Sequence, residues 1–250
     1  METDASDNHG AATSERGARL RSFLDLVRGR RSTRHFRPDP VPPDLLNELL
    51  EAARWAPSGF NLQPTHFVVV TSPESKAKLY PACGEQRQVL EAGATVVFTG
   101  DRRVAENHLD RVLKQDREAG AINEAYEQML RKNVPLLFHE GPLGISRFWK
   151  AAFEAVAGQF VFVPGVQAAH KSFWLGKQVC LSAMAFMLAA QAAGLASCPM
   201  EGFRECWVRR ALGIPSDQLV VLVVAVGYPN DSTPRRTRLP LDGRVHHNGW

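Results

Sequence analysis

The chain has 250 residues, of which 44% are hydrophobic, so it can form one large domain or two small ones, and disorder over most of its length is excluded. Its formal charge of +4 at pH 7 is a modest excess without long lysine runs. This charge favours a phosphate-bearing small ligand over nucleic acid, which usually needs a broad basic face. The four cysteines form no C-x-x-C pair and no histidine cluster completes a zinc site, so we predict reduced thiols, a cytoplasmic protein and no metal.

The N-terminal segment, residues 1–18, is polar and rich in small residues. It lacks the apolar stretch of a targeting signal, and we expect a disordered tail ahead of a single domain over residues 19–250. Apolar residues then recur at helical spacing from Leu20 to Val27, with Gly29 as the stop. The sequence therefore predicts a first helix that ends at Gly29.

The segment VRGRRSTRHF, residues 27–36, holds four arginines beside a serine and a threonine. Arginine presents a planar fork of N–H donors that matches phosphate oxygens, and serine adds a compact donor. A second group, Arg235, Arg236 and Arg238, lies near the C-terminus. Each group is either an anion clamp or an ordinary solvated surface, because exposed arginines are common.

A second helix is predicted across PDLLNELLEAAR, because prolines suit its first turn and the residues from Leu45 to Ala53 form one apolar stripe. A Pro-Ser-Gly sequence ends it. Ser58, Asn61 and Gln63 follow, at the junction with the next strand. Their amide and hydroxyl groups suit the edge of a heterocycle that offers donors and acceptors, although a capped turn favours the same residue types.

Two short runs rich in β-branched residues, 66–71 and 94–101, are predicted to be buried strands, with short helices between them. Residues 102–169 are mostly helical by composition. They include Phe148 and Trp149, whose rings either line a substrate site or belong to the core of a helix pair.

The segment 170–193 predicts one long helix that is apolar on almost every side. Such a helix has to be covered all round, so we expect the centre of a domain or the seam of a dimer rather than a membrane span.

The sequence CPMEGF, residues 198–203, then follows a predicted short strand. Its glycine permits close approach of the backbone to a ring, and an ordinary turn explains it equally well. Residues 219–229 give the strongest strand prediction in the chain.

Several common enzyme signatures do not occur in this sequence. There is no G-x-G-x-x-G fingerprint of a dinucleotide-binding fold, no phosphate loop and no G-x-S-x-G serine nucleophile. His139 and Glu140 are followed by Gly141 and Pro142, which excludes the H-E-x-x-H metal helix.

Five motifs in this order resemble the nitroreductase family of flavoproteins, and most closely the bacterial oxygen-insensitive NAD(P)H nitroreductases. One motif alone has little specificity, but five in order from about residue 20 to residue 242 are specific. The motifs are R-R-S-T-R at 30–34, P-S-x-x-N-x-Q-P at 57–64, K-Q-V-x-L at 177–181, P-x-E-G-F at 199–203 and R-x-R-L-P at 236–240.

The resemblance implies an α+β, three-layer fold in which a central mixed sheet is flanked by helices. It further implies a homodimer that exchanges its C-terminal arms and builds two flavin sites at the interface, each from both chains. Residues 102–169 would be a variable helical insertion over the active site.

The resemblance also implies an FMN-dependent oxidoreductase that uses NADH or NADPH and reduces nitroaromatics, quinones or similar small acceptors by a ping-pong mechanism, with no nucleic-acid or membrane partner. The flavin carries the chemistry, so no catalytic side chain is expected. Phe148 and Trp149 are the candidate substrate contacts. The candidate FMN-binding residues are Arg30, Arg31, Ser32, Thr33, Arg34, Pro57, Ser58, Gly59, Asn61, Gln63, Gln88, Pro199, Met200, Glu201, Gly202, Arg236 and Arg238.

Two positions depart from the family pattern. Thr65 stands where a large residue often follows Q-P, and Glu85 stands where an asparagine commonly contacts the flavin ring. Other reactions on the same fold therefore stay open, namely reductive dehalogenation, flavin fragmentation and ene-type reduction. A protein that stores or senses flavin without fast turnover is the alternative outside enzymology.

Overall fold

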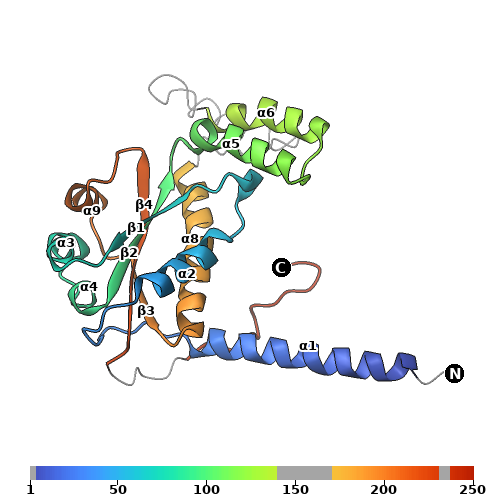
Figure 1. The fold of residues 1–250 in the computed structure, drawn as a ribbon, viewed down its shortest axis with the longest axis horizontal. Helices are drawn as coiled ribbons and strands as arrows, with labels where there is room; N and C mark the ends of the chain where they lie inside the picture. Colours follow the sequence, from blue (N-terminus) through green and yellow to red (C-terminus); the bar gives the residue numbers. More distant parts are fainter. Residues whose placement is uncertain (1–3, 140–170, 231–236) are drawn as a thin grey trace.

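The structure is a computed structural model that describes residues 4–139, 171–230 and 237–250 (Figure 1). Helices and strands alternate along the chain in a way that matches most of the predicted segments. The elements are α1 (Asp4–Gly29), α2 (Pro43–Arg54), the 3-10 turn η1 (Gly59–Asn61), β1 (Thr65–Val70), α3 (Pro73–Leu79), the 3-10 turn η2 (Pro81–Cys83), α4 (Gln88–Glu91), β2 (Ala94–Asp101), α5 (Val104–Glu118), α6 (Glu124–Phe138), α8 (Lys171–Ala192), β3 (Ala196–Met200), α9 (Glu205–Leu212) and β4 (Gln218–Gly227).

The four strands form one sheet in the order β1-β2-β4-β3. All three pairings are antiparallel, and the parallel contact in the described chain is an isolated bridge between Ser32 and Ser197. The expected mixed sheet is therefore corrected to an antiparallel one for the described strands. The strand 94–101 was predicted with the right bounds because every residue of β2 is buried, and its centre is an apolar run, Val96 to Phe98, without polar alternation.

β1 corrects a second prediction, because it lies at the edge of the sheet and is only partly buried. Of its six residues Val70 alone is buried, while His66 and Val69 are exposed. An edge strand has one neighbour, so burial of its side chains depends on what packs over its faces. The run HFVVV does not indicate from its sequence that the strand lies at the edge of the sheet.

Two helical layers cover the sheet, so the predicted three-layer α+β architecture is confirmed (Figure 1). On one face, α2 and α8 pack through Leu49, Ala183 and Phe186 against Phe98 of β2. The rings of Phe98 and Phe186 meet edge to face with centroids 5.5 Å apart, a favoured aromatic arrangement. On the other face, α3, α4 and α9 enclose a second cluster that includes Leu79, Val89 and Val208.

The helices α5 and α6 lie side by side at one end of the sheet (Figure 1). Their contact has its own apolar cluster, in which Leu113 and Val134 are fully buried. Glu127 is also buried at this contact, and Arg131 of the same helix bonds its carboxylate at 2.9 Å. This pair forms the described part of the predicted helical insertion 102–169.

Helix α1 begins at Asp4 and extends as one long rod away from the sheet (Figure 1). It therefore passes through most of the segment 1–18, where the sequence predicted a disordered tail. Alanine, glutamate and arginine residues in this segment are strong helix formers, so the polar composition does not prevent a helix. Its predicted apolar stripe is uncovered, since Leu20 and Phe23 are 58% and 52% exposed.

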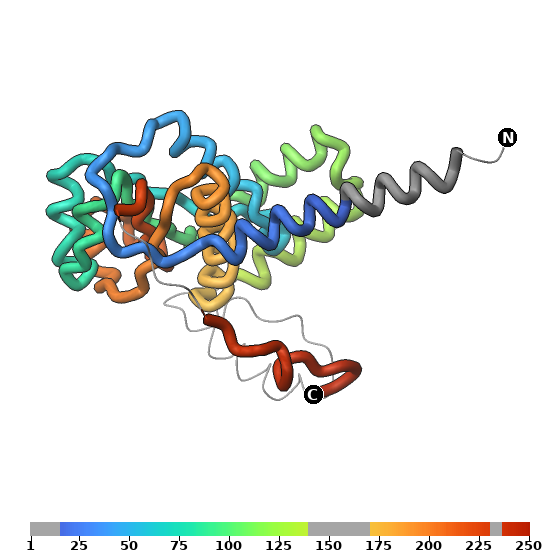
Figure 2. Tube along the Cα trace, turned by 90° about the horizontal axis from the view of Figure 1, so that it is seen from below, coloured from blue at the N-terminus to red at the C-terminus, as the bar shows by residue number. Residues whose placement is uncertain are grey.

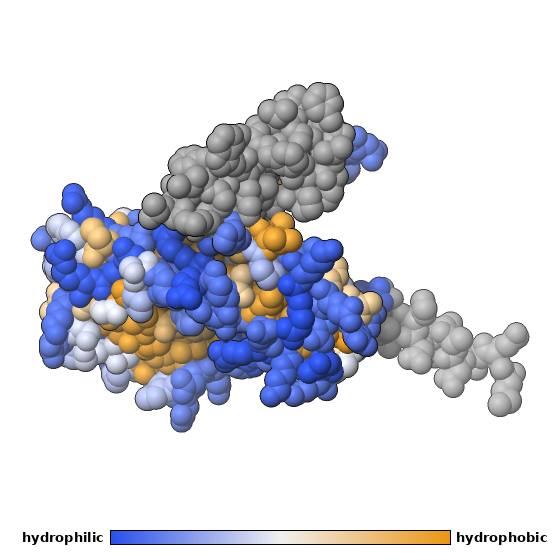
Figure 3. Space-filling model, turned by 90° about the horizontal axis from the view of Figure 1, so that it is seen from above, coloured by the Kyte–Doolittle hydropathy of each residue, from blue (hydrophilic) through white to orange (hydrophobic). Residues whose placement is uncertain are grey.

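Helix α8 crosses the sheet, but only part of its surface is covered within the chain. Trp174, Val179 and Phe186 are buried, whereas an apolar stripe that includes Phe173, Leu181, and Met184 is exposed. By length and composition alone α8 could cross a membrane. Its buried face, however, packs on the sheet and on α2. Figure 3 likewise shows apolar residues gathered between hydrophilic ones on one face of the molecule.

We expect Gly93→Ala to destabilise the fold strongly, because a Cβ atom at Gly93 would lie 2.7 Å from the carbonyl oxygen of Asp39. That neighbour is backbone and cannot rotate away, and overpacking of this kind typically costs about 1–3 kcal/mol or more. Gly249→Ala is the control, since its Cβ would meet nothing within 4 Å. Urea unfolding should show a lower midpoint for Gly93→Ala alone; equal midpoints would contradict the close approach.

Candidate functional site

The arginine-rich segment runs along the start of β3. The backbone N–H of Thr33 donates to the carbonyl of Ser197 at 3.1 Å, and Ser32 pairs with Ser197 in the isolated parallel bridge. Further on, the N–H of Arg37 donates to Tyr228 at the end of β4 at 2.9 Å. These bonds hold residues 30–34 against the outer strand of the sheet, next to the motif that begins at Pro199.

Within this segment the candidate side chains have different surroundings. Arg31 folds back on the end of α1, where its guanidinium donates to the carbonyls of Arg28 and, at 2.9 Å, Gly29. Basic side chains commonly cap the last carbonyls of a helix in this way. Arg34 is exposed, and Thr33 is buried at 3% exposure. Arg31 thus caps the end of α1 in this structure, and its phosphate contact stays a prediction.

The end of β3 is held by amide side chains from the loop before α4. The amide nitrogen of Gln86 donates to the carbonyls of Cys83 at 2.9 Å and of Gly202 at 3.0 Å. The amide of Gln88 in turn donates to the Gln86 side-chain oxygen at 3.0 Å and lies 3.9 Å from the sulfur of Cys198. The structure therefore brings the predicted Gln88 and the P-x-E-G-F motif together.

Glu85 sits beside these amides and is exposed. Its φ of 56° is in the left-handed region, which an L side chain rarely adopts. The anionic side chain that replaces the family's asparagine is thus displayed on a tight turn next to Gln86. Glu201 and Gly202 are also exposed, so their backbone is accessible to a ligand.

The segment from Ser58 to Gln63 forms a strained turn. The Ser58 hydroxyl accepts the N–H of Gln63 at 2.9 Å, and the side chain of Gln178 accepts the N–H of Gly59 at 2.8 Å. Phe60, Asn61 and Gln63 all have positive φ, between 51° and 55°. Such a run costs free energy and is held by its surroundings, which is typical of binding sites.

Other side chains of this turn are tied to its neighbours. The amide of Asn61 donates to both carboxylate oxygens of Asp116 on α5, at 3.1 and 3.3 Å. A Cβ on Gly59 would lie 3.2 Å from the Trp174 ring, so the glycine allows this close packing. Asn61 is therefore bonded within the chain, which differs from a free group aimed at a ligand.

A cavity of about 220 Å³ opens beside this turn, between α2, α8 and β1. Ligand sites usually occupy about 300–1,000 Å³, so one chain does not enclose a complete cofactor site here. Of the candidate residues, Pro57, Ser58 and Gln63 line it. A wider depression of about 480 Å³ between α3 and α9 includes Lys78 and Trp207 but none of the candidates.

The candidate residues thus fall into two separate groups on one chain. The first comprises residues 30–34, 86–88 and 199–202 around β3, at one edge of the sheet. The second, residues 57–63, precedes β1 at the opposite edge (Figure 1). Because two strands separate β1 from β3, one chain does not bring all the candidates together.

Three candidates lie outside the described residues, namely Arg236, Phe148 and Trp149. Arg238 is described and exposed, and its guanidinium donates to the neighbouring carbonyl of Thr237 at 2.8 Å. The described C-terminal arm, residues 237–250, is exposed throughout (Figure 2).

Sequence reasoning missed some residues that the structure places at these groups. Gln178 belongs to the K-Q-V-x-L motif, which was the available signal for its bond to Gly59. Asp116 gave no signal, because it is 55 residues from its partner Asn61. Nor was a metal-ligating set predicted, yet ligand atoms of His66, Asp101 and His108 lie within 4.8 Å of one another.

Comparison with known proteins agrees with this geometry. Residues 27–228 match the profile of the nitroreductase family. A Thermus thermophilus protein named NADH dehydrogenase is 36% identical over 213 residues, which cover 85% of this chain and 89% of the relative. The oxygen-insensitive NAD(P)H nitroreductase of Enterobacter cloacae is 28% identical over 198 residues, covering 75% of this chain and 81% of that protein.

Solved structures are similar over a comparable share of the chain. A Bacillus subtilis structure of the nitroreductase type has a TM-score of 0.72 and 28% identity, and covers 91% of this chain and 99% of its own. An Exiguobacterium sibiricum structure of the same type, solved in complex with FMN, has a TM-score of 0.69 and 25% identity. It covers 90% of this chain and 97% of its own.

Proposed function

Because this chain belongs to the nitroreductase family, we propose that it is an FMN-dependent oxidoreductase that takes electrons from NADH or NADPH. Its acceptors are nitroaromatic compounds, quinones or similar electron-poor small molecules. The observation that carries the proposal is the hydrogen-bonded contact between the arginine-rich segment and β3. This contact supports the proposal because it holds the donors of residues 30–34 near Glu201 and Gly202, which are exposed just after β3.

The residues around β3 fit the phosphate end of FMN. Arg30, Ser32 and Arg34 supply guanidinium and hydroxyl donors, which match the oxygens of a group carrying nearly two negative charges. Ser197 pairs with Ser32 through the backbone bridge. Its side-chain hydroxyl is buried and has no hydrogen-bond partner among the described residues. A buried polar atom of this kind is stabilised by a polar ligand atom nearby.

The same region fits the ring of FMN, which offers both donors and acceptors. The amides of Gln86 and Gln88 can present either kind of group. Glu201 and Gly202 are exposed, and Gly202 has no side chain to hold a ring away.

A second copy of the chain is proposed to complete each site. Residues 57–63 lie at the opposite edge of the sheet from β3, and the cavity beside them is too small for a flavin. The apolar stripes on α1 and α8, represented by Phe23, Leu181 and Met184, are uncovered in one chain. A homodimer that buries these stripes would place residues 57–63 of one protomer against the β3 region of its partner, with exchange of the C-terminal arms.

When bound, FMN supplies the electron transfer between NAD(P)H and the acceptor. The chain's own residues would bind the flavin, orient it and exclude water from its surroundings. Donors near Gly202 would hold the ring edge, and the guanidinium of Arg34 would favour negative charge on the bound group. The nicotinamide and the acceptor would bind in turn at the same open face of the flavin, which is the ping-pong order. The free cysteines fit a cytoplasmic location, since none of the four forms a disulfide.

Retention of FMN is the direct test. Protein mixed with FMN and desalted should keep the absorption bands of the flavin at one FMN per chain. A colourless protein would reject the proposal.

Steady-state oxidation of NADH and NADPH with a nitroaromatic or quinone acceptor then distinguishes an enzyme from a protein that stores or senses flavin. A chain that binds FMN but turns over no acceptor would favour the second function. Reductive dehalogenation, flavin fragmentation and ene-type reduction would each be recognised by their own products.

A further inference from the structure

Three residues with metal-ligating side chains meet at the end of the sheet next to α5. His66 lies on β1, Asp101 ends β2, and His108 lies one turn into α5. One ligand atom from each lies within 4.8 Å of the others. Two imidazoles and one carboxylate are a nitrogen and oxygen set that suits zinc and related divalent transition metals. None of these residues is a candidate for the flavin site.

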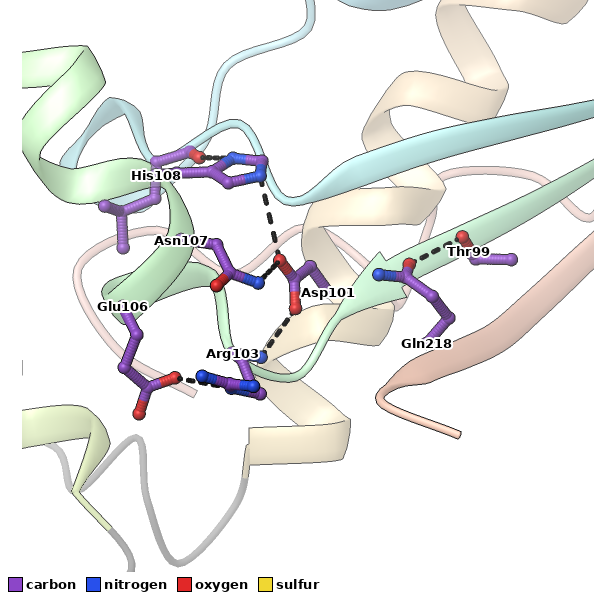
Figure 4. Close-up of polar contacts among 8 residues, drawn as sticks. Thr99, Asp101, Arg103, Glu106, Asn107, His108 and Gln218 are labelled. Atoms are coloured by element: carbon purple, nitrogen blue, oxygen red, sulfur yellow. Dashed lines mark hydrogen bonds and ion pairs between the residues drawn. The ribbon is translucent and has the colours of Figure 1, made fainter. Parts of the chain in front are cut away.

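The carboxylate of Asp101 is fixed in position (Figure 4). Its side chain is 2% exposed, and its Oδ1 atom accepts the backbone N–H of Arg103 at 2.7 Å. Its Oδ2 atom accepts the side-chain amide of Asn107 at 2.8 Å and lies 3.7 Å from Nε2 of His108. Carboxylate oxygens have two acceptor positions each, so Oδ2 keeps one for a cation.

The tautomer of His108 follows from its other contact. Nδ1 lies 3.0 Å from the carbonyl oxygen of Leu62 (Figure 4). A carbonyl oxygen only accepts, so Nδ1 carries the hydrogen and donates it. In the neutral ring Nε2 then has a lone pair that faces the Asp101 carboxylate. Two acceptors that face each other at 3.7 Å are stabilised only by a cation or a proton between them. Metal-bound histidines typically donate their second N–H to a carbonyl in the same way.

His66 supplies the third ligand, which is the second nitrogen of the set. Its ring lies edge-on to that of His108, with centroids 5.6 Å apart. Partial desolvation of the ring, together with the neighbouring His108, lowers the pKa of His66, while Asp101 and Asp217 act in the opposite direction. A neutral imidazole is the form that binds a metal.

We propose that His66, Asp101 and His108 bind one divalent transition-metal ion of the zinc type, with a solvent molecule as the fourth ligand. Tetrahedral zinc with bonds of about 2.0–2.2 Å holds its ligand atoms roughly 3.3 Å apart. The Asp101–His108 separation of 3.7 Å is already close to that spacing. The remaining adjustment falls on His66, whose side chain is exposed on the edge strand.

Such an ion would join β1 to the end of β2 and to α5, which follows β2 directly. It would tie α5 to the sheet and, through the bond from His108 to Leu62, fix the turn that contains Phe60, Asn61 and Gln63. Metal occupancy would therefore stabilise α5 and this turn. The inference does not depend on the flavin site, and its test does not use enzyme activity.

The test is calorimetric titration of the untagged, chelator-treated full chain with Zn²⁺. We expect one ion per chain. His66→Gln and His108→Gln should each weaken binding by at least tenfold, since even loss of a hydrogen-bond partner of a ligand costs about 10–100-fold. His247→Gln in the exposed C-terminal arm and Cys206→Ser are the controls and should bind like the unchanged chain. His66→Gln is the decisive variant because its side chain is exposed on an edge strand, outside the apolar core.

A second readout identifies the ligands. Co²⁺ in place of Zn²⁺ should give the intense visible bands of a tetrahedral site in the unchanged chain and lose them in His66→Gln. Zinc should also raise the unfolding temperature of the unchanged chain, because a ligand that binds only the folded state stabilises it. No zinc binding at millimolar concentration, or binding by both histidine variants as tight as that of the unchanged chain, would overturn the proposal and leave Asp101 and His108 as an ion pair.

Discussion

Arg238→Ala is expected to weaken FMN binding by ten- to a hundredfold, whereas Arg28→Ala should leave it almost unchanged. A charge-assisted hydrogen bond contributes about 1.5–3 kcal/mol, which corresponds to roughly that change in dissociation constant. Arg238 lies in the R-x-R-L-P motif, is exposed, and bonds only the carbonyl of Thr237 within the described chain. Its guanidinium is therefore available to a phosphate.

Arg28→Ala is the matched control because this substitution removes the same charge near the other half of the proposed clamp. It is exposed at the end of α1, and its backbone carbonyl, which the substitution keeps, accepts from Arg31. Any loss through long-range attraction alone should be similar for both variants and is screened over about 8 Å at physiological salt.

Quenching of flavin fluorescence at fixed salt measures both affinities. Equal dissociation constants for the two variants would show that the C-terminal half of the clamp is wrongly assigned. If Arg28→Ala bound FMN more weakly than Arg238→Ala, the phosphate clamp would have to be reassigned to the end of α1.

The double substitution Leu181→Glu with Met184→Glu should convert the protein to a monomer of 27.7 kDa that no longer retains FMN. Both side chains are exposed on α8, at 48% and 38%, and lie on one face of the helix. If a second copy covers this stripe, two carboxylates would be buried there without partners. Burying a charge without a partner costs several kcal/mol, which is enough to dissociate a dimer at micromolar concentration.

Loss of FMN is expected to accompany loss of the dimer, because residues 57–63 and the β3 region lie at opposite edges of one sheet. Leu90→Glu is the control, since Leu90 is a comparably exposed leucine, at 44%, on α4 of the other layer. Light scattering gives the mass and absorbance gives the flavin content. A double variant that stays dimeric would exclude this stripe as the interface, and a monomer that binds FMN fully would show that one chain suffices for the site.

Sequence patterns determined those elements whose environment is uniform along their length. β2 is buried at every residue, so the run ATVVFTGD has the right bounds without further information. The long apolar segment of α8 and the five motifs could also be recognised from the sequence, because each depends on residues a few positions apart. The family resemblance added the cofactor and the phosphate-binding residues, which no single motif specified.

Only the tertiary structure decided how these pieces meet. Strand order places the two candidate groups at opposite edges of the sheet, and it makes β1 a partly exposed edge strand despite its apolar sequence. The motif predicts that Arg31 is a phosphate ligand, and the fold adds that its guanidinium lies at the carbonyls that end α1. His66, Asp101 and His108 become neighbours because β1 pairs with β2 and α5 follows directly. Periodicity and turn residues reflect local interactions, whereas contacts between distant segments depend on how sheet and helices pack as a whole.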